Sequence, residues 1–351
     1  MKFKTILIVI LKNIEIWLYK FLGLENKIVP YKILINLTNN CNSRCTFCSI
    51  WQINKENVEL MEEEIGLNDV VNIFKDLNKN LLWLSLSGGE VTLVSYYKEM
   101  ILAAKKYCPN LKILTFTTNA IASQRAVDYA LFAKSQGLDV FVNISLDGDK
   151  NTHDTLRGIP GGYDSCLKTY DLMKINKVVC YFGLTISDLN YEFIKDKYKE
   201  MNDSMKSITF VHSGGIYNKI NQPNYNKIYK GLEYIYKNYK LNHVSEIIEK
   251  IHIKISLFFV RNEMRSNIIP CEVMNTSVHI MPYGEIKPCM YLPSLGNIKN
   301  DKITQVYSSD EAAKIRKLIK KDECPHCWMN CYSPHSIMQH PLKSLWYLLI
   351  K

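Results

Sequence analysis

Short apolar runs alternate with longer amphipathic segments along the chain from Lys32 onward. The apolar runs have the length and composition of buried strands, and the amphipathic segments repeat their apolar residues at helical spacing. The predicted strands are Lys32–Leu37, Leu82–Ser87, Lys112–Thr117, Val140–Leu146, Val178–Ile186 and Ser207–Val211. The predicted helices between them are Asn68–Leu77, Tyr96–Tyr107, Gln124–Gln136, Ser165–Ile175 and Tyr191–Met201. Such a succession predicts an α/β fold, with a parallel sheet that right-handed crossovers curl into a partial (β/α)6 TIM-like barrel or leave as a twisted sheet.

The pattern changes after Asn226. The Tyr- and Lys-rich stretch Tyr225–Lys250 is expected to be helical, and the apolar run Ile253–Val260 is expected to be a strand. A compact, turn-rich region with more cysteines follows Pro270, so we place a domain boundary near Arg261–Ile269. The predicted units are an N-terminal helix (1–30), the barrel (31–262), a small cysteine-rich domain (263–340) and an apolar C-terminal tail (341–351).

Both ends of the chain carry apolar segments that contain tryptophan. In Met1–Phe21 the apolar run Ile6–Leu11 is far shorter than the ~20 residues that span a bilayer. No small-residue cleavage site follows it, so a signal peptide is not expected. At helical spacing one face would hold Ile6, Ile10, Ile14, Trp17, Leu18 and Phe21. Two interpretations stay open: an amphipathic helix at a membrane interface, or a helix packed on the barrel.

Composition places the 351 residues among folded globular proteins, with 47% hydrophobic and 22% charged residues. The net charge of +10 suits an acidic partner such as a membrane surface or a nucleotide-linked substrate. The basic residues are spread along the chain, apart from a short cluster between Lys314 and Lys321, and no nucleic-acid motif accompanies them. Nucleic acid is therefore not an expected partner.

Three of the eleven cysteines form the run Cys41-x3-Cys45-x2-Cys48, directly after a predicted strand, with Phe47 before the last cysteine. Three thiolates on a [4Fe–4S] cube leave one iron open for a cofactor. A structural zinc site needs four ligands, and no second cysteine pair lies nearby. The motif resembles that of the radical S-adenosylmethionine (SAM) enzymes.

This resemblance implies that Cys41, Cys45 and Cys48 hold the catalytic cluster. That cluster would pass one electron to SAM, and the cleavage would give a 5′-deoxyadenosyl radical that abstracts hydrogen from the substrate. The segment Gly88-Gly89-Glu90 ends the second predicted strand and is similar to the family segment that holds the amino group of SAM.

Further cofactor residues follow from the same resemblance. Phe47 would pack against the adenine, and Asn119 ends the third predicted strand at the same edge of the sheet. The stretch Ser145–Gly158 is similar to one in the branch of the family that carries auxiliary clusters. Ser145 would then contact the SAM ribose or carboxylate and Arg157 would clamp the carboxylate. Asp147 in the same stretch is either a turn cap or a substrate residue, and His153 is not expected to act as a base.

The C-terminal cysteines point to a second metal site, because a hairpin with Gly284 at its turn lies between two of them. That hairpin resembles the one that opens the SPASM and twitch auxiliary-cluster domains. Five cysteines cannot fully ligate two clusters, so we expect one auxiliary [4Fe–4S] cluster. The spacing best matches Cys271, Cys289, Cys324 and Cys327 as its ligands, with Cys331 either spare or replacing one of them. A four-cysteine zinc site is the alternative. The candidate ligands are Cys271, Cys289, Cys324, Cys327 and Cys331, whereas Cys108, Cys166 and Cys180 are expected to be core thiols.

The sequence therefore predicts a cytoplasmic radical SAM enzyme of oxidoreductase type, peripheral at the membrane if its ends bind lipid. Its partner would be a one-electron donor of the flavodoxin or ferredoxin type. The main hypothesis for the substrate is a sugar, nucleotide-linked sugar or lipid-linked saccharide that is oxidised or epimerised. Two alternatives remain: a maturase that cross-links or epimerises a ribosomal peptide, and a non-catalytic iron–sulfur scaffold, which would need no SAM pocket.

Overall fold

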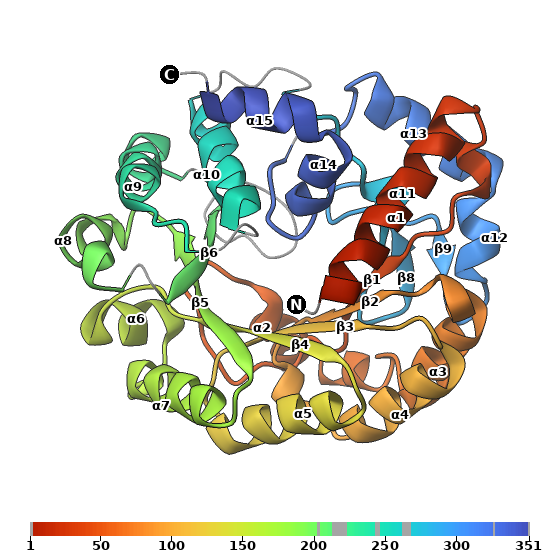
Figure 1. Cartoon of the computed structure of the whole chain (residues 1–351). Coiled ribbons are helices and arrows are strands. Elements are labelled where there is room, and N and C mark those ends of the chain that lie inside the picture. The colour runs from red at the N-terminus through yellow and green to blue at the C-terminus, as the bar shows by residue number, and fades with distance from the viewer. Residues whose placement is uncertain are drawn as a thin grey trace.

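The computed structural model describes residues 3–201, 204–212, 223–242, 246–261, 268–325 and 327–349 of the chain. A curved sheet forms its centre, with helices along the outer side (Figure 1). Six parallel strands lie side by side in chain order. They are β1 (Lys32–Asn36), β2 (Trp83–Ser87), β3 (Ile113–Thr118), β4 (Asp139–Ser145), β5 (Val179–Ile186) and β6 (Met205–Phe210). The predicted α/β fold with a six-stranded parallel partial barrel is confirmed.

Amphipathic helices connect these strands and cover the sheet from outside. Helix α3 shows why, because its apolar residues Val70, Ile73, Phe74 and Leu77 are all buried on one stripe. The predicted helices agree with the structure to within three residues at either end. The connecting helices are α2 (Ile50–Glu56), α3 (Leu67–Leu77), α4 (Tyr97–Tyr107), α5 (Ser123–Ser135), α6 (Lys150–Arg157), α7 (Gly162–Ile175) and α8 (Tyr191–Met201).

The sheet continues past β1 into the C-terminal region. Strand β7 (Ser277–Ile280) pairs with β1 in parallel, and β8 (Glu285–Lys287) and β9 (Gly296–Asn297) follow antiparallel. Gly284 has φ 92° in the turn between β7 and β8, as the predicted hairpin requires. The cysteine-rich region is thus joined to the barrel by one continuous sheet, while the predicted boundary at 262/263 lies outside the described residues. Its helices are α11 (Val273–Thr276), α12 (Ile303–Tyr307), α13 (Asp310–Lys320) and α14 (Ser333–Gln339).

The expected strand at Ile253–Val260 is wrong, because this segment is part of helix α10 (Glu246–Val260). A single helix over Tyr225–Lys250 is also wrong, since α9 (Tyr225–Asn238) ends earlier. Helix α10 lies against the free edge of β6, where the Glu249 carboxylate accepts the backbone N–H of Ile208 at 2.7 Å. Helix α10 also packs on α9 and α14, so it is covered on several sides and its sequence is apolar almost throughout. Such a run lacks the spacing that distinguishes a helix from a strand, which is why the sequence pattern failed here.

Helix α1 (Phe3–Phe21) lies across the amino ends of the barrel strands. Its buried residues Val9 and Ile16 pack on Tyr31, Leu82 and Ile113, each of which precedes or begins a strand. The apolar face expected from the sequence points elsewhere, since all six of its residues are exposed. Near the other end of the chain, α15 (Pro341–Leu349) packs on α10 and α14. Within the described residues, no helix combines the length and apolar character needed to cross a membrane.

Packing of α1 can be tested by comparing two isoleucines of the same helix. Ile16→Ala should lower the free energy of unfolding by roughly 2–5 kcal/mol, because Ile16 is buried among the strand ends. Ile10→Ala should change it by no more than about 0.5 kcal/mol, because Ile10 is 49% exposed. Denaturant unfolding of the three proteins measures both values, and equal effects would contradict the packing.

Candidate cofactor site

A cavity of about 260 Å³ lies at the carboxyl ends of the barrel strands. Parallel α/β folds bind ligands at this edge because loops from successive strands converge there. The cavity is lined by every residue predicted for the first cluster and for SAM. These are Cys41, Cys45, Phe47, Cys48, Gly88, Gly89, Glu90, Asn119, Ser145 and Arg157.

The cysteine loop between β1 and α2 is held against the turn that follows β2. Gly89 donates its N–H to the Thr38 carbonyl at 2.6 Å, and Glu90 donates to the Asn40 carbonyl at 2.9 Å. A Cβ on Gly89 would lie 2.1 Å from the Asn40 oxygen, and a Cβ on Gly88 would lie 2.5 Å from the Thr38 oxygen. The two glycines therefore allow the cysteine loop itself to approach, in addition to leaving room for a ligand.

Glu90 is 1% exposed and braces the ends of β2 and β3. Its Oε1 accepts the N–H and hydroxyl of Thr92 and the hydroxyl of Thr118, and its Oε2 accepts the N–H of Asn119. Burial raises the pKa of Glu90, and these donors offset part of that rise. A carboxylate has about four acceptor positions, and these four donors account for them, so the structure shows Glu90 as a brace between strand ends. Its contact with the ammonium group of SAM stays a prediction.

Asn119 also acts on the cysteine loop. Its amide Nδ2 donates to Asn42 Oδ1 at 2.7 Å and to Ser43 Oγ at 2.8 Å, and it lies 3.9 Å from the sulfur of Cys41. The end of β3 is thus bonded to the middle of the loop that carries the cysteines.

Glu64, which the sequence did not single out, joins the start of the same loop to helix α2, which follows the loop. Its carboxylate accepts the hydroxyl of Thr38 at 2.6 Å, the N–H of Asn39 at 2.6 Å and the amide of Asn54 at 2.8 Å. In the sequence it is the last of three consecutive glutamates, a charged run that is usually exposed to solvent. Only the fold reveals that this one is turned inward.

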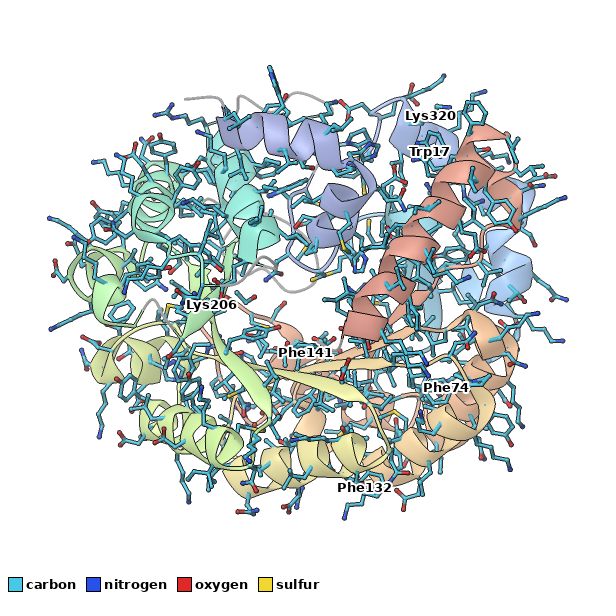
Figure 2. All side chains as sticks on the ribbon, viewed as in Figure 1. Trp17, Phe74, Phe132, Phe141, Lys206 and Lys320 are labelled. Carbon is cyan, nitrogen blue, oxygen red and sulfur yellow. The ribbon has the colours of Figure 1, made fainter. Side chains whose placement is uncertain are left out.

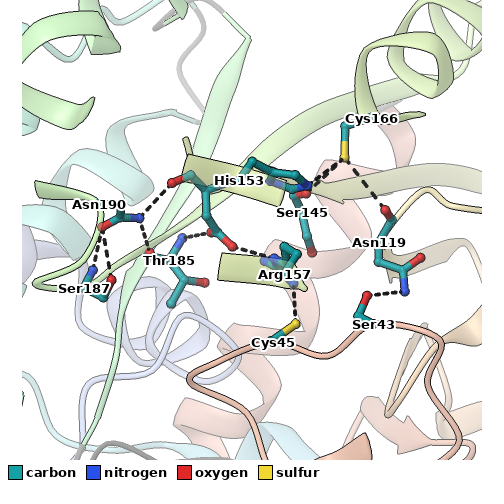
Figure 3. Close-up of polar contacts among 11 residues, drawn as sticks. Ser43, Cys45, Asn119, Ser145, His153, Arg157, Cys166, Thr185, Ser187 and Asn190 are labelled. Atoms are coloured by element: carbon teal, nitrogen blue, oxygen red, sulfur yellow. Dashed lines mark hydrogen bonds and ion pairs between the residues drawn. The ribbon is translucent and has the colours of Figure 1, made fainter. Parts of the chain in front are cut away.

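Arg157 links α6 to the cysteine loop (Figure 3). Its Nε donates to Asp147 Oδ2 at 2.5 Å, its Nη1 lies 3.8 Å from Cys45 Sγ, and its guanidinium lies over the Phe47 ring. Burial opposes the charge of Arg157, but Asp147 and Cys45 more than compensate, so its pKa lies above the usual range. The arginine is paired with Asp147 inside the protein, and its contact with the carboxylate of SAM stays a prediction.

Asp147 and His153 help to hold Arg157 in place. Asp147 Oδ1 accepts the N–H of Thr185 at 2.8 Å, so the residue is neither a simple turn cap nor open to a substrate. The ring Nδ1 of His153 accepts the N–H of Asp147, and burial lowers the pKa of His153 to about 4. The other ring nitrogen, Nε2, lies 3.7 Å from Cys166 Sγ, so both nitrogens of this buried ring have protein partners, which agrees with the expectation that His153 is not a base.

Four polar residues of the cavity were not singled out at the sequence level: Thr185, Ser207, Thr209 and Asn330. Asn143 and Ser145 are two apart on β4, as Gly183 and Thr185 are on β5 and Ser207 and Thr209 on β6, so each pair faces the cavity. The sequence signal that could have identified them is the occurrence of polar residues at alternate positions of otherwise apolar strands. Among the described residues, the buried Oδ1 of Asn143 has no hydrogen-bond partner, and it suits a ligand hydroxyl.

The donor chemistry fits an iron–sulfur cube with SAM beside it. The three cysteines come from one loop, and burial raises the pKa of Cys41 to about 11 and that of Cys48 to about 12. Ligation needs thiolates, so cluster assembly at these cysteines must release protons. Glu90 and Asn143, whose buried Oδ1 has no hydrogen-bond partner among the described residues, line the same cavity as the thiols.

A second cavity, of about 70 Å³, lies in the C-terminal region and is lined by Cys271, Cys289, Cys324 and Cys327. The pKa of Cys327 is raised by burial and by the other three cysteines. Cys331 is not among the lining residues; its carbonyl accepts Lys32 Nζ at 3.0 Å, on the side of β1. This grouping agrees with the predicted four-ligand set and with a spare Cys331. Within the described residues, no three His, Cys, Asp or Glu side chains are arranged to hold a single metal ion.

The fold and these two sites define a cluster-binding α/β barrel enzyme of the radical SAM class. Residues 35–201 match the radical SAM superfamily, and residues 271–332 match SPASM, an iron–sulfur cluster-binding domain. The chain belongs to the radical SAM superfamily, with a C-terminal SPASM domain, and SAM and iron–sulfur clusters are its cofactors. The match favours iron–sulfur over zinc for the C-terminal cysteines.

Curated relatives include two proteins of Bacillus subtilis. The chain is 25% identical to the sporulation killing factor maturation protein SkfB over 181 residues, which cover 50% of this chain and 40% of SkfB. It is 22% identical to the antilisterial bacteriocin subtilosin biosynthesis protein AlbA, over 85% of this chain and 65% of AlbA. The chain thus spans less than two thirds of the length of either relative.

Solved structures with the same fold include native anSMEcpe with bound AdoMet, with a TM-score of 0.61 and 16% identity. That match covers 92% of this chain and 100% of the other. Streptococcus suis SuiB bound to its precursor peptide SuiA matches with a TM-score of 0.59 and 18% identity. It covers 81% of this chain and 66% of SuiB.

Gly89→Ala tests the contact between the cysteine loop and the β2 turn. The added methyl group would collide with the Asn40 carbonyl, so the isolated protein should lose about four irons per chain. Gly66→Ala is the control, because its Cβ would approach no atom closer than 3.9 Å. Iron and sulfide analysis measures the result, and full iron content in Gly89→Ala would contradict the loop geometry.

Glu64→Ala tests the second brace of the loop. Three donors would lose their acceptor, so iron of the first cluster should pass to a chelator about tenfold faster. Glu63→Ala is the matched control, since the neighbouring Glu63 is exposed and pairs with Lys299. Chelator kinetics that are equal in both variants would show that Glu64 does not position the loop.

Proposed function

We propose that this enzyme matures a ribosomally made peptide by abstracting hydrogen from one of its carbon atoms, which leads to a cross-link or an inverted centre. The relatives SkfB and AlbA are named for maturation or biosynthesis of peptide products, and SuiB has a precursor peptide bound. These likenesses favour the peptide alternative over the main hypothesis of a sugar or lipid-linked substrate.

The observation that carries the proposal is the charge of the cavity. Of the described residues that line it, Arg157 is the only basic one, and it is already paired with Asp147. A nucleotide-linked sugar brings a diphosphate, which proteins usually meet with arginine, lysine or a helix N-terminus. The described wall beyond the cofactor residues instead offers hydroxyl and amide groups, which suit the neutral polar groups of a peptide.

The position of the apolar helices weakens the lipid-linked option further. Helix α1 packs on residues at the amino ends of the strands, whereas the cavity is lined by residues at their carboxyl ends. A lipid surface that meets α1 would therefore lie at the opposite end of the barrel from the cavity.

The protein's own contribution is to hold and orient the reactants. When bound, SAM and its cluster supply hydrogen-atom abstraction from carbon. The cysteine loop is fixed by Gly88, Gly89 and Glu64, and Arg157 supplies positive charge beside Cys45. Thr185, Ser207, Thr209 and Asn330 form the wall where a substrate would hydrogen bond.

The second cluster site lies directly behind this wall. Met329 lines the C-terminal cavity and the adjacent Asn330 lines the SAM cavity, so one short segment separates them. Four thiolates would occupy every iron of an auxiliary cube and leave none open to a substrate. Such a site suits electron transfer and hence an oxidised product such as a cross-link. The expected external partner is a one-electron donor of the flavodoxin or ferredoxin type.

The test uses the reconstituted protein with SAM, a reductant and synthetic peptides that correspond to short open reading frames near its gene. We expect peptide-dependent formation of 5′-deoxyadenosine and, for a cross-link, a product lighter by two hydrogen atoms, both measured by mass spectrometry. The variant in which Cys41, Cys45 and Cys48 are replaced by alanine should form neither. Stimulation by a nucleotide-linked sugar, with no change in any peptide, would overturn the proposal.

A further inference from the structure

Two apolar helices form an exposed surface outside the cofactor sites. Of the twenty large hydrophobic residues that are exposed in the described chain, twelve lie on α1 and α15, so exposed apolar surface is concentrated there. Trp17 is 54% exposed and stacks on Phe21 at 5.6 Å, and Trp346 is 56% exposed. The exposed residues are Ile6, Leu7, Ile10, Leu11, Ile14, Trp17, Leu18 and Phe21 on α1, and Leu342, Leu345, Trp346 and Leu349 on α15.

Both helices lie on the side of the molecule that faces the viewer in Figure 1, and both pack on α14. Helix α1 is anchored by its opposite side, through Val9, Ile16 and a hydrogen bond from Thr5 Oγ1 to Asp139 at 2.8 Å. The apolar face is thus left over after the helix has packed on the barrel. Isolated exposed hydrophobic residues are common, but a concentration of this size marks a contact site.

The charges around this surface favour an anionic occupant. Helix α1 contains three lysines and one glutamate. Lys12 pairs with Glu15 at 2.8 Å and Lys20 pairs with the buried Glu272, so these side chains together carry one net positive charge. Helix α15 contains Lys343 and no acidic residue. The exposed Lys317 and Lys320 belong to α13 and the exposed Lys321 follows it. Helix α13 contacts the same short helix η1 (Glu25–Lys27) as α1 does, and Figure 2 labels Lys320 and Trp17 on the same side of the view.

We infer that this α1–α15 surface binds the headgroup region of an anionic lipid bilayer. Exposed tryptophans on apolar helices with lysines beside them are the composition of peripheral membrane helices. The barrel would then rest on the bilayer by the amino ends of its strands, with the SAM cavity turned away from the lipid. The enzyme would be held at the membrane while its substrate enters from the aqueous side.

Vesicle flotation of the reconstituted enzyme tests this surface. The protein should float with vesicles of phosphatidylglycerol mixed with phosphatidylcholine, much less with phosphatidylcholine alone, and less as salt is raised. Replacing Trp17 and Phe21 with Ser should reduce the floated fraction about tenfold, because apolar burial at the interface is lost. The control replaces Leu102 and Ile175 with Ser, two residues that are equally exposed on α4 and α7. Trp346→Ser should also weaken flotation.

Thermal unfolding and 5′-deoxyadenosine formation should be unchanged in these variants, because none of the substituted residues lines either cavity. Equal flotation with both kinds of vesicle, or an equal loss in the Leu102 and Ile175 control, would overturn the inference. So would light scattering that shows self-association without lipid and a monomer once Trp17 and Phe21 are replaced, since the surface would then bind a second copy.

Discussion

The cofactor site depends on one close approach, between the cysteine loop and the backbone of Gly88 and Gly89. Three backbone hydrogen bonds, from Leu37, Gly89 and Glu90, extend the pairing of β1 and β2 beyond the strands themselves. Because side chains are absent at both glycines, the loop lies close enough to form these bonds. Three thiols on a flexible loop would not be preorganised for a cluster, and this contact supplies the rigidity that the short loop lacks.

Around this contact, buried polar groups brace the loop from other elements. Glu64 joins the start of the loop to α2, and Asn119 holds the middle of the loop. Arg157 from α6 reaches Cys45 while paired with Asp147. Such networks are strong because the interior dielectric is low, and an unpaired member is correspondingly costly. The same residues therefore stabilise the fold and line the site. Glu90 and Arg157, for example, line the cavity but form their hydrogen bonds with other residues of the protein.

The C-terminal region takes part in the same construction. The β7–β8 turn contacts the segment that carries Glu64, through the N–H of Ile65 on the Pro282 carbonyl at 2.7 Å and the Tyr283 hydroxyl on Asn54 at 3.4 Å. Because β7 also pairs with β1, the auxiliary cavity has a fixed position relative to the SAM cavity. Met329 and Asn330, one residue apart, face the two. The amino ends of the strands, which α1 covers, take no part in either cavity and are available for contacts with other molecules.

The amino-acid sequence by itself determined the order of strands and helices, the cysteine loop and the glycines, because these depend on local periodicity and on residue types with few alternative uses. Gathering Cys271, Cys289, Cys324 and Cys327 in one cavity, away from Cys331, needed the folded chain, since their spacing allows other sets. Tertiary packing also decided that Ile253–Val260 is helical, because an apolar run buried between β6, α9 and α14 carries no clear period. Tertiary packing also decided that α1 packs through Val9 and Ile16 and leaves its other apolar residues exposed, because α1 is apolar on more than one face. It decided that Glu64, rather than the neighbouring Glu62 or Glu63, points inward, because only long-range contacts distinguish three consecutive glutamates.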